Sequence, residues 1–247
     1  MMIKHAFFGH CVSLGDALVM NAIVHHVSRN CEHVYYPAKP STVATLACLY
    51  QDHNNITVKA FDTLAQQREF IQEHQLVHLL ETSPLETHLI HRVNCEPEYV
   101  HALWQHQIYD NYDLAYSTRY RDFHMPTTIA GEDELYQQLN PNNEEYVLVH
   151  RYTGTHPQGI PIYIDTNLKC IEVSEGVSEN LLAYRKLIRC ASEIHCVSSS
   201  FFTLVDSMTQ DTAAKLFFHD IRKNSLMRIN SRWNNWRWEI IHYNIRV

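Results

Sequence analysis

Hydrophobic and polar positions alternate along the first third of the chain in a way that predicts strands and helices in turn. The apolar run 2–9 ends at a glycine and predicts a buried strand, and the segment 13–30 carries a broad apolar face typical of a helix. The pattern continues with strands over 33–38 and 55–61, helices over 41–52 and 63–75, and a further apolar run over 76–81. Parallel strands need crossover helices, so this order indicates a doubly wound parallel sheet.

The second half of the chain repeats this order after an irregular, aromatic-rich middle. The segment 131–145 predicts a helix that is ended by Asn140-Pro141. Beyond it the pattern predicts strands over 146–151, 170–174, 193–199 and 214–219. It predicts helices over 179–191 and 200–208. Periodicity breaks at 124–130, and the tail 230–243 carries three tryptophans that we expect to dock. We therefore predict an α/β protein of two Rossmann-like βαβ domains, 1–125 and 126–247, facing each other across a cleft.

Composition narrows the class of protein further. The formal charge of −7 and the pI of about 6.2 argue against a general nucleic-acid binder, which usually carries a basic excess. The seven cysteines form no CxxC pair, which is typical of reduced thiols in a cytosolic protein. No signal peptide and no apolar run of membrane-spanning length is visible, so we expect a soluble, cytoplasmic protein.

Several familiar site motifs are absent from the sequence. The eighteen histidines build neither HExxH nor a paired Cys/His spacing, so we expect no metal site. There is no GxGxxG, GxxxxGK[ST] or GxSxG, and the chain has only six glycines. Contacts to phosphate would therefore rely on helix ends and side chains.

Asp16 is the first candidate, because it opens a helix directly after the first predicted strand. Ser13-x-x-Asp16 fits a capping box, in which the role of the acid is only to stabilise the N-terminus of the helix. The same position is at the carboxyl end of a strand, where doubly wound folds bind ligands. A carboxylate there could accept a proton from a bound hydroxyl, and both interpretations stay open.

The second half offers candidates at corresponding positions. Ser198, Ser199 and Ser200 precede a helix, where hydroxyls cap the helix or form an anion site suited to a diphosphate. Arg151 ends a strand and would pair with a surface acid or grip phosphate oxygens. Glu172 is unusual in a buried strand and would be paired structurally or would bind ribose hydroxyls. Arg119, in "STRYRDF", would contact an acidic ligand or be a solvated charge.

Three stretches of the sequence together resemble a known protein family. A strand followed by "SLGDALVMNAIVHHVSRNCEHVYY" resembles the opening of GT-B glycosyltransferases of the heptosyltransferase type. The strand "YVLVHR" and the stretch "LLAYRKLIRCASEIHCVSSSFFTLVDSM" resemble the first strand and the donor-phosphate loop of their second domain. Thr203 stands where that loop usually has a histidine. The resemblance implies an N-terminal acceptor domain and a C-terminal donor domain.

The resemblance also implies roles for the candidates. Asp16 would be the base for the acceptor hydroxyl, and Ser198 to Ser200 with Arg151 would hold the donor diphosphate. We expect a metal-independent glycosyltransferase that uses a nucleotide sugar, has no cofactor, and acts on a glycan or another hydroxyl acceptor. The alternatives are a non-catalytic nucleotide or sugar-phosphate binding protein on the same fold, and an interaction protein that uses the tryptophan-rich tail.

Overall fold

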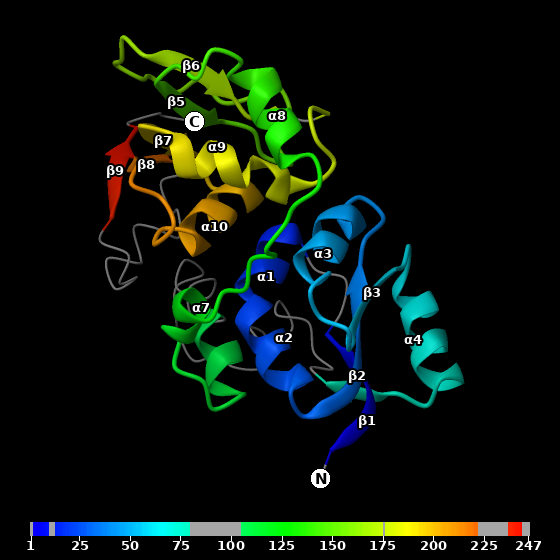
Figure 1. The fold of residues 1–247 in the computed structure, drawn as a ribbon. Helices are drawn as coiled ribbons and strands as arrows, with labels where there is room; N and C mark the ends of the chain where they lie inside the picture. Colours follow the sequence, from blue (N-terminus) through cyan, green and yellow to red (C-terminus); the bar gives the residue numbers. More distant parts are fainter. Residues whose placement is uncertain (1, 10–12, 80–104, 175, 222–236, 244–247) are drawn as a thin grey trace. The chain divides into compact units, whose positions relative to one another are not determined.

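The computed structural model describes residues 2–9, 13–79, 105–174, 176–221 and 237–243. The chain divides into two compact units, Met1–Thr128 and Ile129–Val247. Each unit contains one parallel sheet with helices packed on it (Figure 1). The expected α/β class with two Rossmann-like domains is therefore confirmed. Among the described residues no helix has both the length and the apolar character needed to cross a bilayer.

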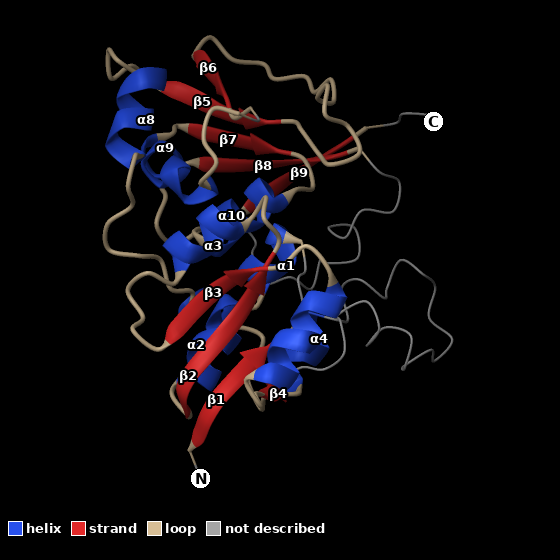
Figure 2. Cartoon of the chain, turned by 90° about the vertical axis from the view of Figure 1, so that its right-hand side faces the viewer, coloured by secondary structure: helices blue, strands red, loops and turns tan. Residues whose placement is uncertain are grey.

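The first unit has a four-stranded sheet in the order β3-β2-β1-β4, with every pair parallel. Its elements are β1 (Ile3–Phe8), α1 (Leu14–Val19), α2 (Asn21–Ser28), β2 (Cys31–Ala38), α3 (Val43–Leu49), β3 (Ile56–Ala60), α4 (Leu64–Glu73), β4 (Val77–Leu79) and α7 (Thr118–Arg121). In Figures 1 and 2, α4 covers one face of this sheet and α2 covers the other.

The central strand β1 shows how the sequence produces these layers. Phe7 and Phe8 are both fully buried, and because side chains alternate along a strand they point to opposite faces. Phe7 packs against Phe70 of α4, with 6.3 Å between ring centroids, and against Phe61. Phe8 stacks on Tyr36 of β2. The end of the strand, Ala6 to Phe8, is buried on both faces and is therefore apolar throughout, whereas Lys4 and His5 near its start are exposed.

The predicted helix over 13–30 is two helices in the structure. α1 begins after Ser13, the expected N-cap, and ends at Met20, whose backbone N–H bonds to the carbonyl of Asp16. α2 follows at once and begins with Asn21, which is fully buried. The Oδ1 atom of Asn21 accepts a hydrogen bond from the backbone N–H of His124 at 2.7 Å. This bond joins α2 to a segment about a hundred residues later in the chain.

The second unit has a five-stranded parallel sheet in the order β6-β5-β7-β8-β9. Its elements are α8 (Glu132–Leu139), β5 (Tyr146–His150), β6 (Lys169–Glu172), the 3₁₀ helix η1 (Leu181–Tyr184), α9 (Arg185–Cys190), β7 (Glu193–Cys196), α10 (Ser200–Ser207), β8 (Lys215–Asp220) and β9 (Trp238–His242). Figure 2 shows α9 and α10 along one face of this sheet. The predicted helix over 179–191 corresponds to η1 followed by α9.

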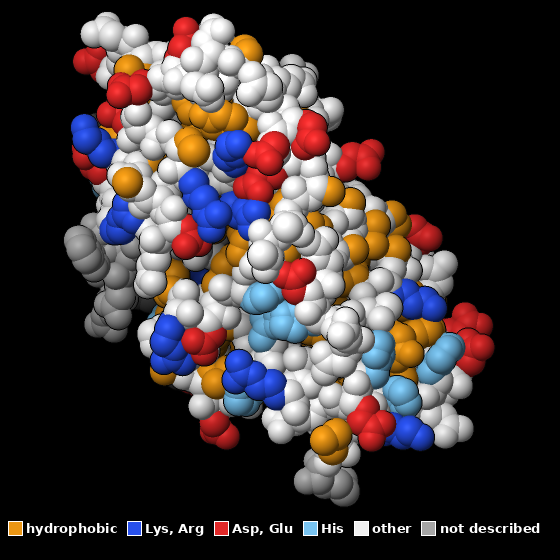
Figure 3. Space-filling model, in the orientation of Figure 1, with side chains coloured by type: hydrophobic (Ala, Val, Ile, Leu, Met, Phe, Trp, Pro, Cys, Tyr) orange, Lys and Arg blue, Asp and Glu red, His pale blue; other side chains and the backbone are white. Residues whose placement is uncertain are grey.

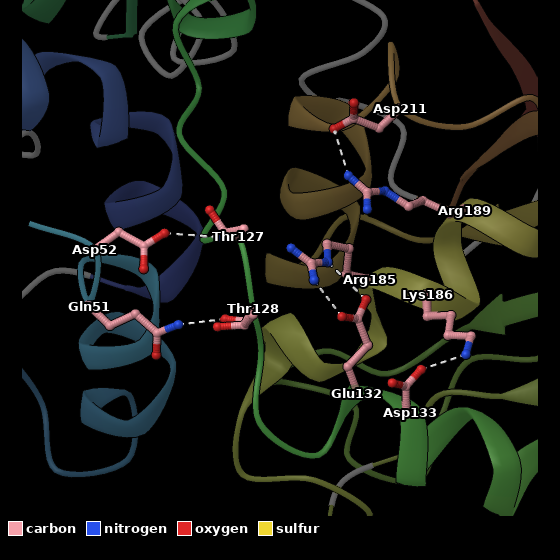
Figure 4. Close-up of polar contacts among 10 residues, drawn as sticks. All are labelled: Gln51, Asp52, Thr127, Thr128, Glu132, Asp133, Arg185, Lys186, Arg189 and Asp211. Atoms are coloured by element: carbon pink, nitrogen blue, oxygen red, sulfur yellow. Dashed lines mark hydrogen bonds and ion pairs between the residues drawn. The ribbon is translucent and has the colours of Figure 1, made fainter.

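A buried ion pair holds α8 to α9 in this unit. Arg185 Nε donates to Glu132 Oε1 at 2.8 Å, and Nη2 donates to Oε2 at 2.5 Å (Figure 4). The two side chains are 8% and 13% exposed, so the bidentate geometry compensates for charges taken out of water. Lys186 and Asp133 add a more exposed pair beside it, 2.5 Å from Nζ to Oδ1.

The described part of the tail forms strand β9 at the edge of the second sheet, which the sequence pattern did not predict. Trp238 at its start is buried, packs against Phe202 at 4.9 Å between ring centroids, and donates its indole N–H to Asp206 Oδ1 at 3.0 Å. Arg237 adds bonds to the carbonyls of Thr212 and Ala214. The other tryptophans of the tail, at 233 and 236, lie outside the described residues.

We expect Trp238→Ala to destabilise the protein by roughly 3–5 kcal/mol, because it empties a packed site and removes the bond to Asp206. Trp238→Phe keeps most of the apolar contact and should cost about 1–3 kcal/mol for the lost hydrogen bond. Urea unfolding followed by circular dichroism measures both. A loss below about 1 kcal/mol in Trp238→Ala would contradict the view that β9 is anchored by this side chain.

Candidate functional site

The second sheet reverses its strand order at β5, which has β6 on one side and β7 on the other. Open parallel sheets bind ligands outside the carboxyl ends of the strands at such a reversal. The residues at this place are His150 and Arg151 at the end of β5, Ser198 and Ser199 between β7 and α10, and Ser200 at the start of α10. Most of the site residues expected in the second half are therefore brought to one edge of one sheet.

Ser199 follows β7 and contacts the end of β5 through His150. It is the N-cap of α10, and its Oγ accepts a hydrogen bond from the backbone N–H of Phe202 at 3.1 Å. The same oxygen lies 3.2 Å from His150 Nδ1 and 3.1 Å from the carbonyl of Val197. The capping interpretation of Ser199 is confirmed. The first N–H groups of α10 still have no acceptor within the helix, so the anion site remains chemically available.

His150 was not among the expected binding residues, yet it lies at the centre of this edge. Its ring stacks on Phe201 at 5.0 Å between centroids. Burial lowers the pKa of His150 to about 4, so its imidazole is neutral at pH 7. Its Nδ1 forms a hydrogen bond with the Ser199 hydroxyl. In the sequence, the one feature that marks His150 as a site residue is its position at a strand end, directly before Arg151.

Arg151 and Glu172 form one ion pair at the carboxyl ends of β5 and β6. Arg151 Nε donates to Glu172 Oε1, and Nη2 donates to Oε2 at 3.2 Å. The hydrogen bonds from Arg151 lower the pKa of the Glu172 carboxyl, which keeps it ionised. Both side chains are a little over one third exposed, so the pair contributes little to stability. Structural pairing, one of the interpretations left open for each residue, is thus present.

This ion pair lines a pocket of about 370 Å³. Val149 and Cys170 from the two strands form one part of its wall, and the loop residues Ile162, Tyr163 and Ile164 form another. Tyr163 is 74% exposed, an unusual state for a large aromatic side chain. The sequence contains the Gly/Pro-rich loop that leads to it, but no pattern marks Tyr163 itself as a pocket residue.

Asp16 lies in the first turn of α1, after the carboxyl end of β1 in the first unit. The Oγ atom of Ser13 accepts from the Asp16 backbone N–H at 3.2 Å and donates to Asp16 Oδ2 at 2.7 Å. The capping arrangement expected from the spacing is therefore present, and it orients the carboxylate. The carboxylate is half-buried rather than enclosed.

Arg119 lies in the interior of the first unit. It is 1% exposed, and its Nη1 donates to Tyr116 OH at 2.6 Å and to Gln105 Oε1 at 3.2 Å. Tyr120 lies under the guanidinium, 5.0 Å from ring centroid to Cζ. This burial contradicts the interpretation of Arg119 as a solvated charge, and the contact to an acidic ligand stays a prediction.

Comparison with solved structures relates the chain to one characterised fold. The crystal structure of a glycosyl transferase family 9 protein from Veillonella parvula DSM 2008 matches with a TM-score of 0.59 and 8% sequence identity. The match covers 98% of this chain and 88% of that chain. No protein-family model matches the sequence, and no curated protein does. At this identity the likeness shows that the two proteins share a fold.

We expect Ser199→Ala to destabilise the protein by about 1 kcal/mol, because it removes the N-cap bond of α10. Ser198→Ala is the matched control, since the Ser198 side chain makes no hydrogen bond to the described residues and should change stability by less than about 0.5 kcal/mol. Thermal unfolding of both variants measures the difference. Equal effects of the two substitutions would contradict the capping role.

Proposed function

We propose that this chain is a glycosyltransferase that moves a sugar from a nucleotide-activated donor to an acceptor hydroxyl, without a catalytic metal. The observation that carries the proposal is the arrangement at the strand-order reversal of the second sheet. There, Arg151 at the end of β5 lines a pocket, and the capped N-terminus of α10 follows the neighbouring strand β7. The fold shared with a glycosyl transferase family 9 protein supports the same conclusion.

The donor diphosphate would bind at this edge. Glu172 occupies Nε and one N–H of Nη2 of Arg151, so the guanidinium keeps the N–H groups of Nη1 for phosphate oxygens. The N-terminus of α10 adds backbone N–H groups and the positive end of the helix dipole. Glu172, held ionised, would accept a hydrogen bond from a ribose hydroxyl. Both positive groups would stabilise the diphosphate as it leaves.

Asp16 would act on the acceptor. In the transfer step the acceptor hydroxyl gives its proton to the Asp16 carboxylate, and its oxygen forms a bond to the anomeric carbon of the sugar. The bond between that carbon and the diphosphate oxygen breaks, and the electron pair leaves with the nucleoside diphosphate. The bond from Ser13 to Oδ2 orients the carboxylate that would receive the proton.

A nucleotide-binding protein without transfer activity is the second candidate. The observation that favours it is the Ser13–Asp16 hydrogen-bond pair, which gives Asp16 a role in the helix cap. This candidate keeps the proposed donor site and assigns no chemistry to Asp16. The two candidates therefore differ at one residue.

The donor site is tested by thermal shift of the purified protein against nucleoside diphosphates and nucleotide sugars, with and without EDTA. A ligand at a hundred times its dissociation constant adds about 2.7 kcal/mol to the free energy of unfolding, which is readily detected. We expect a shift that persists in EDTA and is lost in Arg151→Ala. Arg189→Ala is the control, because Arg189 also carries a half-exposed ion pair, with Asp211. No shift with any nucleotide would overturn both candidates.

The catalytic role of Asp16 is tested by Asp16→Asn in an assay of sugar transfer with the donor found above. Removing a general base lowers turnover by roughly 10²–10⁴-fold. The amide still accepts the Ser13 hydroxyl, so stability should fall by less than about 1 kcal/mol and nucleotide binding should be unchanged. Turnover within a few-fold of the wild type would exclude Asp16 as the base. Nucleotide binding by a wild type without transfer activity would favour the second candidate.

A further inference from the structure

Three histidines far apart in the sequence meet in the first unit. His25 lies on α2, His53 lies in the loop between α3 and β3, and His124 follows α7. One ring nitrogen of each lies within 4.8 Å of the others. Figure 3 shows histidine side chains gathered near the middle of the face in view, next to a carboxylate. We call these three residues the histidine cluster.

Two ring nitrogens of this cluster lack the partners that buried polar atoms normally have. His53 Nε2 and His124 Nε2 are buried and have no hydrogen-bond partner among the described residues. Burial without a partner is uncommon and costs free energy. Burial also lowers the pKa of all three rings, that of His25 to about 3, so they are neutral at pH 7. A neutral imidazole with an open lone pair is the form that binds metals.

Asn21 positions two of the three rings. Its Oδ1 accepts the backbone N–H of His124 at 2.7 Å, which leaves Nδ2 to face His25 Nε2 at 3.3 Å. The first bond sets the orientation of the amide and fixes the start of the His124 side chain. The second bond is long, so a stronger interaction at His25 Nε2 can replace it.

The pocket at the cluster carries charges of both signs. The three rings line a pocket of about 460 Å³ together with Arg29, Asn55, Asp122 and other side chains. Asp52 Oδ2 lies 3.9 Å from His124 Nε2, and it accepts the backbone N–H of Thr127 at 2.9 Å (Figure 4). Asp52 therefore holds negative charge beside the nitrogen, in a fixed position. The pocket leaves room for water beside the rings.

We propose that His25, His53 and His124 form a Zn²⁺ site. Three imidazoles with one position left open are an established ligand set for zinc, and imidazole also suits Cu²⁺, Ni²⁺ and Co²⁺. Zn–N bonds of about 2.0–2.1 Å in tetrahedral geometry place ligand nitrogens about 3.4 Å apart. Binding therefore draws the rings closer. His25 is held in a helix, and His53 and His124 lie in loops that can supply this movement.

The position of the site in the sheet indicates a structural role. His25 lies in the last turn of α2, the helix that leads to β2, and His53 lies just before the start of β3. Both are at the amino edge of the parallel sheet, whereas the proposed acceptor base Asp16 follows the carboxyl end of β1. The ion would join α2, the loop before β3 and the segment after α7. The site is thus independent of the proposed transfer reaction.

Aromatic packing explains only part of the cluster. The ring centroids lie 4.1 Å apart for His25–His53, 4.5 Å for His53–His124 and 4.8 Å for His25–His124. These distances are typical of packed aromatic pairs. Apolar rings would pack equally well, however, and would leave no nitrogen without a partner. Zinc binding would explain why all three positions are histidine rather than an apolar residue.

The test is zinc binding by the untagged, full-length protein after removal of metals with EDTA and gel filtration. Titration calorimetry with ZnCl₂ at pH 7.5 should show one ion per chain. His53→Gln and His124→Gln should each lower the affinity by at least about 100-fold, since even losing an outer-shell partner costs 10–100-fold. Co²⁺ should give the visible absorption of a tetrahedral site, which no purely structural role of the rings would produce.

The matched control is His26→Gln, because His26 neighbours His25 on α2 and lies outside the cluster. It should bind zinc as the wild type does. Circular dichroism identifies variants that fail to fold, and Asn21→Asp, which retains the acceptor oxygen, gives a second variant with altered but measurable affinity. Absence of stoichiometric zinc binding by the wild type would overturn the proposal. Equal loss in His26→Gln and His53→Gln would overturn it too.

Zinc should also stabilise the first unit. With zinc at a hundred times its dissociation constant, the segment 122–128 should resist limited proteolysis in the wild type and not in His124→Gln. Equal cleavage of the wild type with and without zinc would contradict the structural role.

Discussion

A parallel sheet must bury both of its faces, and this constraint decides where polar side chains can lie in each unit. In β5, Tyr146 to Val149 are all buried, and the first polar side chains follow directly at the carboxyl end. The same holds for β1, where Phe8 is buried and Asp16 follows after the turn at Gly9. Side chains that can meet a ligand are therefore confined to the strand ends, and parallel pairing brings those ends to one edge.

At the carboxyl edge of the second sheet, each charge already has a protein partner. Arg151 is paired with Glu172, and Ser199 is engaged with the helix backbone and His150. Such pairing orients the side chains before a ligand arrives, which reduces the entropy lost on binding. Because the ion pair is partly exposed, its net contribution to stability is small. A ligand can therefore take over part of the arginine's hydrogen bonding at modest cost.

The amino edge of the first sheet shows the opposite condition. His53 and His124 carry buried nitrogens without hydrogen-bond partners among the described residues, although Asn21 and Asp52 next to them are bonded to the backbone. Preorganised neighbours around unsatisfied ring nitrogens are what a metal site requires. We propose that the two units use their strand ends differently: the paired charges at one edge would bind an anion, and the ring nitrogens at the other would bind a cation.

The sequence by itself determined most of the strands and the approximate extent of the helices, because burial periodicity and capping are local properties of the chain. The apolar runs of β1 and β5 and the Ser13 cap could be read directly, and with them the α/β class. Only the tertiary structure decided which polar groups meet. The pairing of Arg151 with Glu172, the burial of Arg119, the strand at Trp238 and the meeting of His25, His53 and His124 all join segments that are distant in sequence. Such contacts depend on strand order and on packing, for which no local spacing exists.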